Sequence, residues 1–230
     1  MDDTIMEYER SVSPKIVNYI ETNILPQYSQ NDKAHGLVHI KEVVRRSFAL
    51  NETLGLNLNP DMIYVIASYH DIGKFENHEI HEIISAQKFL ADEKIKTFFN
   101  EDEVRCIAEA IEDHRSSSNT HRSIYGQLIS SADRNTTVDM VFIRSFFVAQ
   151  ERMPDSPIEE YLDYTIQRLS KRYSKENPES MVLRDAAYEQ FLEEMRTILK
   201  DPPTFKARYC AINNIDNRNG RVKDFSGFIE

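Results

Sequence analysis

Cysteine, tryptophan, glycine and proline are all scarce in this chain of 230 residues, which has two, none, six and eight of them respectively. Cys106 and Cys210 lie far apart and belong to no CxxC pair. The sequence therefore indicates neither a disulfide framework nor a cysteine-based zinc site. This use of cysteine fits a protein of the reducing cytoplasm.

A membrane-spanning segment is also missing. The longest apolar stretch, MIYVIASY at residues 62–69, is far shorter than the roughly 20 residues that cross a bilayer. The N-terminal sequence MDDTIMEYER is acidic and has no apolar signal core. We therefore expect a soluble, cytoplasmic protein without a membrane partner.

Positive charge is in short supply, because 28 Lys and Arg residues stand against 38 Asp and Glu, for a formal net charge of −10. Surfaces that bind nucleic acid need many cationic side chains along the phosphate backbone, so nucleic acid is not an expected partner. A local basic pocket for one small anion is compatible with this balance. The sequence predicts no particular oligomeric state.

Helical periodicity is what the chain does have. Apolar residues make up 40% of it and recur at helical rather than alternating spacing, which predicts an all-α fold. A length of 230 residues suits one large core. We expect a single helical domain over residues 1–200 and a C-terminal tail over 201–230 that is partly ordered, because its last part is polar and rich in Asn.

Capping residues mark most of the helix boundaries. Ser13 is placed to cap the first helix, and Asn100 and Glu103 have capping-box spacing. Helices are predicted over about 14–24, 36–54, 60–71 and 100–114, from about 79, 124 and 157 onward, and over 180–200 as the last long one, ended by the sequence DPP. The helix over 60–71 is apolar on almost all sides, so we expect it in the middle of the bundle.

All seven histidines lie in one part of the chain, between positions 35 and 121. A buried imidazole or carboxylate needs a partner that offsets its desolvation, and one shared cation satisfies several such groups at once. His70 and Asp71 stand near the end of the central helix, and neighbouring helices offer His39 and Asp133. Two imidazoles and two carboxylates predict a divalent metal site that suits Mn²⁺ or Fe²⁺ better than a closed structural zinc site, with Mg²⁺, Ni²⁺, Co²⁺ and Zn²⁺ left open.

This order of ligands resembles the HD-domain superfamily of metal-dependent phosphohydrolases. The matching residues are His39 in HIKEVV, His70 and Asp71 in YHDIGK, and Asp133 in SADR, and the match covers about residues 35–135. The resemblance implies a compact multi-helix bundle with the metal site in its centre. It also implies that a metal-activated water cleaves a phosphoester or phosphoanhydride bond in a small phosphorylated metabolite, commonly a nucleotide.

Two further histidines match a subset of this superfamily that holds a second metal ion. By that resemblance, His81 and His114 are candidates for the second ion, and the alternative is that they contact a substrate phosphate. His78 competes with His81 for this place. His35 lies four residues before His39, on the same predicted helix face, and competes with it as the first ligand.

Candidate catalytic residues stand beside the same ligands. Asp71 could orient the attacking water. Lys74 follows the glycine after the HD pair and could contact a substrate phosphate, or it could remain a solvated lysine near a helix end. Arg134, next to Asp133, could bind phosphate or pair with a carboxylate.

Two substrate classes within the superfamily are disfavoured. Its guanosine-tetraphosphate hydrolases carry an acidic pair where this chain has Lys74 and Phe75, and the Gly-Tyr-Pro tripeptide of its cyclic-dinucleotide phosphodiesterases is absent.

Two other classes of function stay open. The histidine and aspartate set also resembles that of the di-iron oxygenases, which cleave C–C or C–P bonds with O₂. The third class is a non-catalytic nucleotide-binding HD module, which would bind its ligand without turnover.

Overall fold

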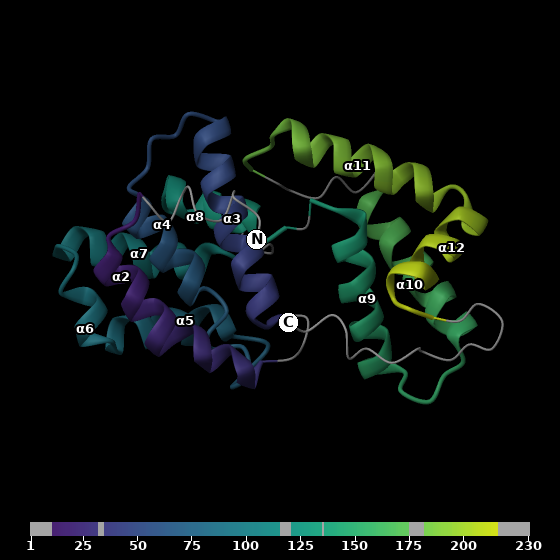
Figure 1. Ribbon diagram of the computed structural model, residues 1–230, viewed down its shortest axis with the longest axis horizontal. Coiled ribbons are helices and arrows are strands. Elements are labelled where there is room, and N and C mark those ends of the chain that lie inside the picture. The colour runs from purple at the N-terminus through teal and green to yellow at the C-terminus, as the bar shows by residue number, and fades with distance from the viewer. Residues whose placement is uncertain (1–10, 32–34, 116–120, 135, 175–181, 216–230) are drawn as a thin grey trace. The chain divides into compact units, whose positions relative to one another are not determined.

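All of the regular structure in the described part of the chain is helical. The computed structural model describes residues 11–31, 35–115, 121–134, 136–174 and 182–215, and Figure 1 shows its helices. No β-strand occurs in these residues, so the all-α prediction is confirmed. Within the same ranges, no helix combines the length and the apolar character needed to cross a membrane.

The chain divides into two compact units. The first consists of residues 1–134 together with 181–185, and the second of residues 135–180 together with 186–230. The single domain predicted over residues 1–200 stays a prediction, because compactness alone does not establish which segments fold together.

The first unit is a set of helices around α4. In chain order it contains α2 (Pro14–Tyr19), the π-helix η1 (Ile20–Ile24), the 3₁₀ helix η2 (Leu25–Gln30), α3 (Leu37–Thr53), α4 (Pro60–Tyr69), α5 (His81–Ala91), α6 (Glu93–Lys96), α7 (Glu101–Asp113) and α8 (Ile124–Ala132). Helix α4 contacts α3, α5, α7 and α8. Each of its residues from Met62 to Tyr69 is buried, as predicted for a helix that is apolar on almost all sides.

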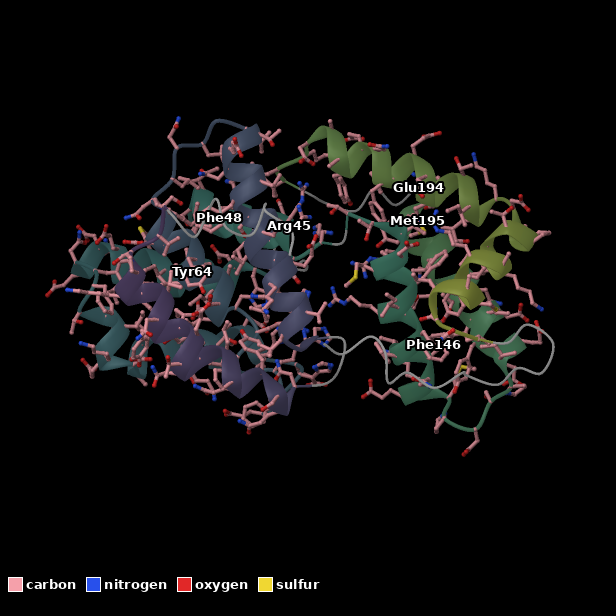
Figure 2. The ribbon with its side chains drawn as sticks, in the orientation of Figure 1. Arg45, Phe48, Tyr64, Phe146, Glu194 and Met195 are labelled. Carbon is pink, nitrogen blue, oxygen red and sulfur yellow. The ribbon has the colours of Figure 1, made fainter. Side chains whose placement is uncertain are left out.

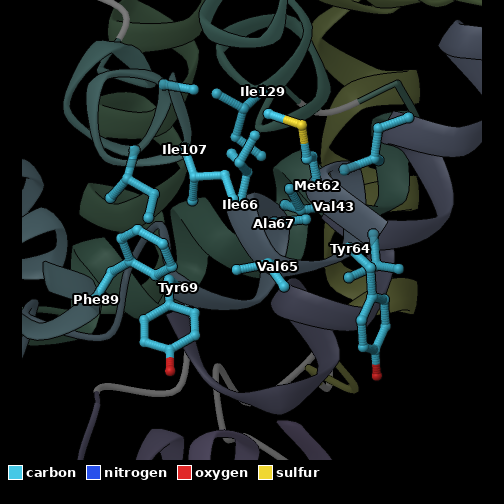
Figure 3. Packing of buried hydrophobic residues seen from close by; sticks show 14 of the residues in the cluster. Val43, Met62, Tyr64, Val65, Ile66, Ala67, Tyr69, Phe89, Ile107 and Ile129 are labelled. Carbon is cyan, nitrogen blue, oxygen red and sulfur yellow. The ribbon is translucent and has the colours of Figure 1, made fainter. Parts of the chain in front are cut away.

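Apolar side chains from several helices close around α4. Met62 and Ile66 of α4 lie with Ile107 of α7 and Ile129 of α8 in the core, and none of the four is more than 4% exposed (Figure 3). Burial of such a side chain contributes about 1.5–3 kcal/mol. Because the core surrounds α4 along its length, it also fixes the C-terminal end of this helix, where the HD pair follows.

The helix starts follow the capping signals with one exception. Asn59 caps α4 by accepting from the N–H of Asp61, and Asn100 and Glu103 form the predicted capping box at the start of α7. The side chain of Ser13, in contrast, makes no capping bond, and its backbone N–H donates to the Asp61 carboxylate at 2.6 Å. The helix predicted over 14–24 is α-helical only at its start, because it becomes the π-helix η1.

The second unit is a helical bundle with an aromatic core. It contains α9 (Val138–Arg152), α10 (Ile158–Tyr173), α11 (Ala186–Leu199) and α12 (Pro202–Ile212). The ring centroid of Phe142 lies 5.0 Å from that of Phe205 and 5.4 Å from that of Tyr209. Phe146 of α9 and Met195 of α11 are fully buried inside this unit (Figure 2).

Helix α12 corrects one prediction. The sequence DPP at residues 201–203 is predicted to end the last long helix, but the same residues start another one. The Asp201 side chain accepts from the N–H of Thr204, and Pro202 occupies the first helical position, where its missing N–H costs nothing. The start of the predicted tail is therefore helical, and residues 216–230 of that tail lie outside the described ranges.

A buried ion pair ties the segment that contains Asp185 to α3 of the first unit. Both terminal nitrogens of Arg46, on α3, donate to the carboxylate of Asp185 at 2.6 Å. The two side chains are only 4% and 5% exposed. The N–H of Leu183 also donates to the hydroxyl of Ser131 at the end of α8. The segment that contains Leu183 and Asp185 is thus held by an ion pair that solvent hardly screens.

We expect the Asp185→Asn variant to lose about 3–5 kcal/mol of unfolding free energy, because it leaves the Arg46 charge buried without its carboxylate. Urea denaturation followed by far-UV circular dichroism measures this loss, since the chain has no tryptophan. The control is Glu42→Gln, which breaks the half-exposed Arg45–Glu42 pair on the same helix and should cost about 0–1 kcal/mol. Equal losses in the two variants would contradict the prediction.

Candidate metal centre

The HD pair lies where the central helix ends. His70 is the C-cap residue of α4, and the chain then turns, with the N–H of Ile72 donating to the carbonyl of Tyr69 and that of Lys74 to the carbonyl of Asp71. This turn leaves both members of the pair inside the protein, with His70 0% and Asp71 1% exposed. The two side chains therefore need partners within the protein.

His39, His70 and Asp133 form a first ligand group. They come from α3, from the C-cap of α4 and from the C-cap of α8. The Nε2 atom of His39 lies 3.0 Å from Oδ1 of Asp133, and Nε2 of His70 lies 3.9 Å from the same oxygen. The three side chains are close enough together to hold one metal ion.

Asp71, His81 and His114 form a second ligand group. His81 is the first residue of α5 and His114 is the C-cap residue of α7. Oδ1 of Asp71 lies 3.2 Å from Nε2 of His81 and 3.5 Å from Nε2 of His114, and the two nitrogens are 3.1 Å apart. Ligand atoms at about 2.1 Å from one ion lie about 3.0 Å apart in an octahedral site and about 3.4 Å apart in a tetrahedral one. The second group fits one ion by this measure.

Asp71 connects the two groups through its two carboxylate oxygens. Its Oδ2 atom lies 3.6 Å from Nε2 of both His39 and His70, in the first group. Its Oδ1 atom faces His81 and His114, in the second. A carboxylate in this position can serve two cations at once.

Hydrogen bonds to backbone carbonyls orient three of the imidazoles. The Nδ1 atoms of His70, His81 and His114 lie 2.8, 3.0 and 2.6 Å from the carbonyl oxygens of Ala67, His78 and Ile111. An Nδ1–H that donates to a carbonyl leaves Nε2 with a lone pair, which is the tautomer that metal-binding histidines use. The Nε2 atoms of His81 and His114 face each other at 3.1 Å, a distance at which either a proton or a shared cation can lie between them.

Several of these ligand atoms are buried and lack a hydrogen-bond partner among the described residues. They are Nε2 of His39, Nε2 of His70, Oδ1 of Asp71 and Oδ1 of Asp133. The contact between His39 and Asp133 is short but does not have hydrogen-bond geometry. Buried polar atoms in folded proteins are nearly always satisfied, so four orphans converging in one place fit a metal centre. The donor set, imidazole and carboxylate, is one that divalent transition metals accept.

The electrostatics of the centre favour a cation. Burial tends to raise the pKa of Asp71 and Asp133, but the surrounding imidazoles, His70 for Asp71 and His39 for Asp133, outweigh it and hold both pKa values below the usual range. Burial lowers the pKa of His70 to about 3, against the opposing pull of the Asp71 charge. Both carboxylates are therefore charged and His70 is neutral at pH 7, as metal binding requires.

Lys74 and Arg134 lie at the edges of the ligand groups. The Nζ atom of Lys74 lies 3.5 Å from Oδ1 of Asp71 and 3.5 Å from Nε2 of His81, and its side chain is 12% exposed. This places an ammonium group against the second ligand group. Arg134, the residue after Asp133, is buried, with 6% of its surface exposed. The phosphate contacts predicted for Lys74 and Arg134 stay predictions.

The competing histidines lie beside the groups rather than in them. The ring of His35 is 5.8 Å from that of His39 and 5.5 Å from that of His78, centroid to centroid. His78 contributes its backbone carbonyl to the Nδ1 atom of His81, as described above. The structure thus brings His39 and His81 into the two groups, in place of His35 and His78, and their role as ligands stays a prediction.

Asn31 is a residue of the centre that the sequence does not reveal. Its side-chain nitrogen donates to the carbonyls of His35 and Asp71, and its side-chain oxygen accepts from the N–H of Phe75, all at 3.1 Å. It therefore joins the chain before α3 to the turn that carries the HD pair. No local signal marks it, because an Asn between helices ordinarily indicates only a turn.

Comparisons with known proteins agree with this geometry. The family profile of the HD domain matches residues 36–137, which include all six residues of the two ligand groups. An uncharacterized protein from Clostridium beijerinckii is 30% identical over 122 residues, which are 51% of this chain and 74% of that protein. A crystal structure of a protein from Lactobacillus plantarum has a TM-score of 0.59 at 16% identity, over 87% of this chain and 99% of that one, which shows a shared fold.

We expect divalent metal binding near pH 6.5 to release a proton from His114. Burial lowers the pKa of this imidazole, but the nearby Asp71 carboxylate outweighs burial and raises the pKa above its usual value. The ring then holds its proton in the metal-free protein to a higher pH than an ordinary imidazole does. Its Nε2 must lose this proton to bind an ion, so affinity falls as the pH falls.

Calorimetric titration with Mn²⁺ in two buffers of different ionisation enthalpy measures this proton release. The His114→Asn variant should release fewer protons, because the ring is gone while the first ligand group is intact. Binding enthalpies that are identical in both buffers would show the prediction to be wrong.

Proposed function

This chain belongs to the HD-domain superfamily of metal-dependent phosphohydrolases, and from that premise we propose that it hydrolyses a phosphoester or phosphoanhydride bond of a small phosphorylated metabolite, with nucleotides as the substrate class. The observation that carries the proposal is the set of buried, unsatisfied ligand atoms in the two ligand groups that the Asp71 carboxylate connects. Burying these charges and lone pairs without a cation would destabilise the folded protein.

We assign the first ion to His39, His70, Asp71 and Asp133, and a second ion to Asp71, His81 and His114. Mixed imidazole and carboxylate ligands suit Mn²⁺ or Fe²⁺. Ions of this kind supply a water activated at neutral pH and polarise a phosphoryl oxygen. The remaining chemistry depends on side chains of this chain.

Lys74 is the cation placed to receive the substrate phosphate. Its Nζ atom lies beside the second ligand group, and the 12% exposure of its side chain puts it at the boundary between the centre and solvent. In a chain of net charge −10, this local positive charge attracts an anionic group to one point. Its role in the reaction is to stabilise the charge that develops on the phosphoryl oxygens.

Asp71 has the second catalytic role. Its two oxygens face the two ligand groups, so it holds both in one arrangement and can accept a hydrogen bond from the attacking water. Because the pKa of Asp71 is held below its usual range, this acceptor stays ionised through the neutral pH region.

The His70→Ala and Asp71→Asn variants should lose metal and at least about 10³-fold in kcat/KM together, because each removes a ligand. Lys74→Met should keep its metal and lose about 10²–10³-fold in kcat, because only the charge near the phosphate is removed. Metal content by plasma mass spectrometry and phosphate release from a nucleotide panel measure these effects. A metal-free variant that kept full activity would contradict the assignment of these residues as metal ligands.

Oxygen dependence separates the two alternative classes. We expect phosphate release with Mn²⁺ under strictly anaerobic conditions, which excludes a di-iron oxygenase reaction as the main activity. Iron-dependent O₂ uptake without phosphate release would establish the oxygenase instead. Saturable nucleotide binding without any turnover, in protein loaded with Mn²⁺ or Fe²⁺, would identify a binding module.

A further inference from the structure

The turn that carries the HD pair makes a buried hydrogen bond to α5. The backbone N–H of Gly73 donates to the hydroxyl of Ser85 at 3.0 Å, and the Ser85 side chain is fully buried. A serine hydroxyl on a helix more often bonds to a carbonyl of its own helix, as Ser47 does with Val43 on α3. Ser85 instead satisfies a donor twelve residues earlier in the chain.

Gly73 allows α5 to approach this turn at backbone contact distance. A Cβ atom at this position would lie 2.7 Å from Cγ2 of Ile84 and 2.9 Å from the backbone nitrogen of Ser85. Distances this short do not occur for real Cβ atoms, so any other residue would push α5 away from the turn. The glycine is needed here for space, and it brings Ser85 within hydrogen-bond reach.

The bond lies directly behind two members of the second ligand group. Asp71 precedes Gly73 by two residues in the turn, and His81 precedes Ser85 by one helical turn on the same face of α5. The 3.2 Å distance between Oδ1 of Asp71 and Nε2 of His81 therefore depends on how α5 sits against the turn. The first group has no ligand on α5, because His39, His70 and Asp133 come from α3 and from the ends of α4 and α8.

We propose that Ser85 is a positioning residue that holds His81 against Asp71 and so sets the affinity of the second ligand group for its ion. The inference rests on the proposed function, since it concerns the second of the two ions assigned there. Ser85 touches neither the ion nor the substrate, and it acts through the seating of α5. Its loss affects the second ion and leaves the first one in place.

The test is a Mn²⁺ titration of the full chain carrying Ser85→Ala. We expect the first ion to bind as in the unchanged protein and the dissociation constant of the second to rise about 10–100-fold, the usual cost of an altered outer shell. Electron paramagnetic resonance gives an independent readout, because a coupled Mn²⁺ pair and an isolated Mn²⁺ ion have different spectra. At intermediate Mn²⁺ concentration the variant should show the isolated ion.

The matched control is Ser47→Ala, which removes the hydroxyl of another fully buried serine, one bonded only within its own helix. It should bind both ions normally. Gly73→Ala is a second variant, expected to weaken the second ion more strongly because it moves α5 directly. Circular dichroism checks that each variant is folded. If Ser85→Ala does not fold, Ser85→Cys replaces it in the titration with the same expected direction, because it keeps a side chain of similar size but replaces the hydroxyl with a weak acceptor.

The outcomes are distinguishable. Unchanged binding of both ions by a folded Ser85→Ala variant, or equal weakening of both, overturns the role of Ser85. A single ion in the unchanged protein also overturns it. Failure of the unchanged protein to bind any divalent ion overturns the proposed function itself.

Discussion

The desolvation of one carboxylate is the constraint on which the centre depends. Asp71 is 1% exposed, and a buried charge of this kind is tolerated only when opposite charges or hydrogen-bond donors surround it. Four imidazole nitrogens and the Lys74 ammonium lie within 3.2–3.6 Å of its two oxygens, and a cation held between these nitrogens and the carboxylate would offset the desolvation. The segments that supply them are α3, the end of α4, α5 and the end of α7. The packing of these helices in the first unit therefore both forms the apolar core and places polar groups around the Asp71 carboxylate.

This arrangement separates what the core does from what the ligands do. Helix α4 is buried from Met62 to Tyr69, so apolar packing along this helix positions the HD pair at its end. His81, at the exposed-to-buried boundary where α5 begins, is instead held through Gly73 and Ser85. The first ligand group is thus positioned by core packing, while the second depends on the contact between the turn at Gly73 and α5.

The sequence carries signals for the candidate ligands but few for the residues that support them. His39, His70, Asp71 and Asp133 can be picked out because their identity and order carry chemistry, and the helices around them carry clear capping and periodicity signals. Asn31, Ser85 and Asp185 carry no such signal, because each acts through a bond to a residue 12 to 139 positions away. Helix α12 was missed for a local reason, since the sequence DPP both stops one helix and starts the next. His78 and His81 are both close to the HD pair in sequence, and the preference for His81 as a ligand stays a prediction.

Three of the candidate ligands share a position in their helices. His70, His114 and Asp133 are the C-cap residues of α4, α7 and α8, so the C-terminal ends of three helices point toward one small volume. Each such end carries about half a negative charge from its aligned peptide dipoles, at no cost in ionisable groups. The backbone therefore contributes a standing negative potential that no pH change in the working range removes. A divalent cation bound at this place would be stabilised by the main chain as well as by the side chains that select the metal.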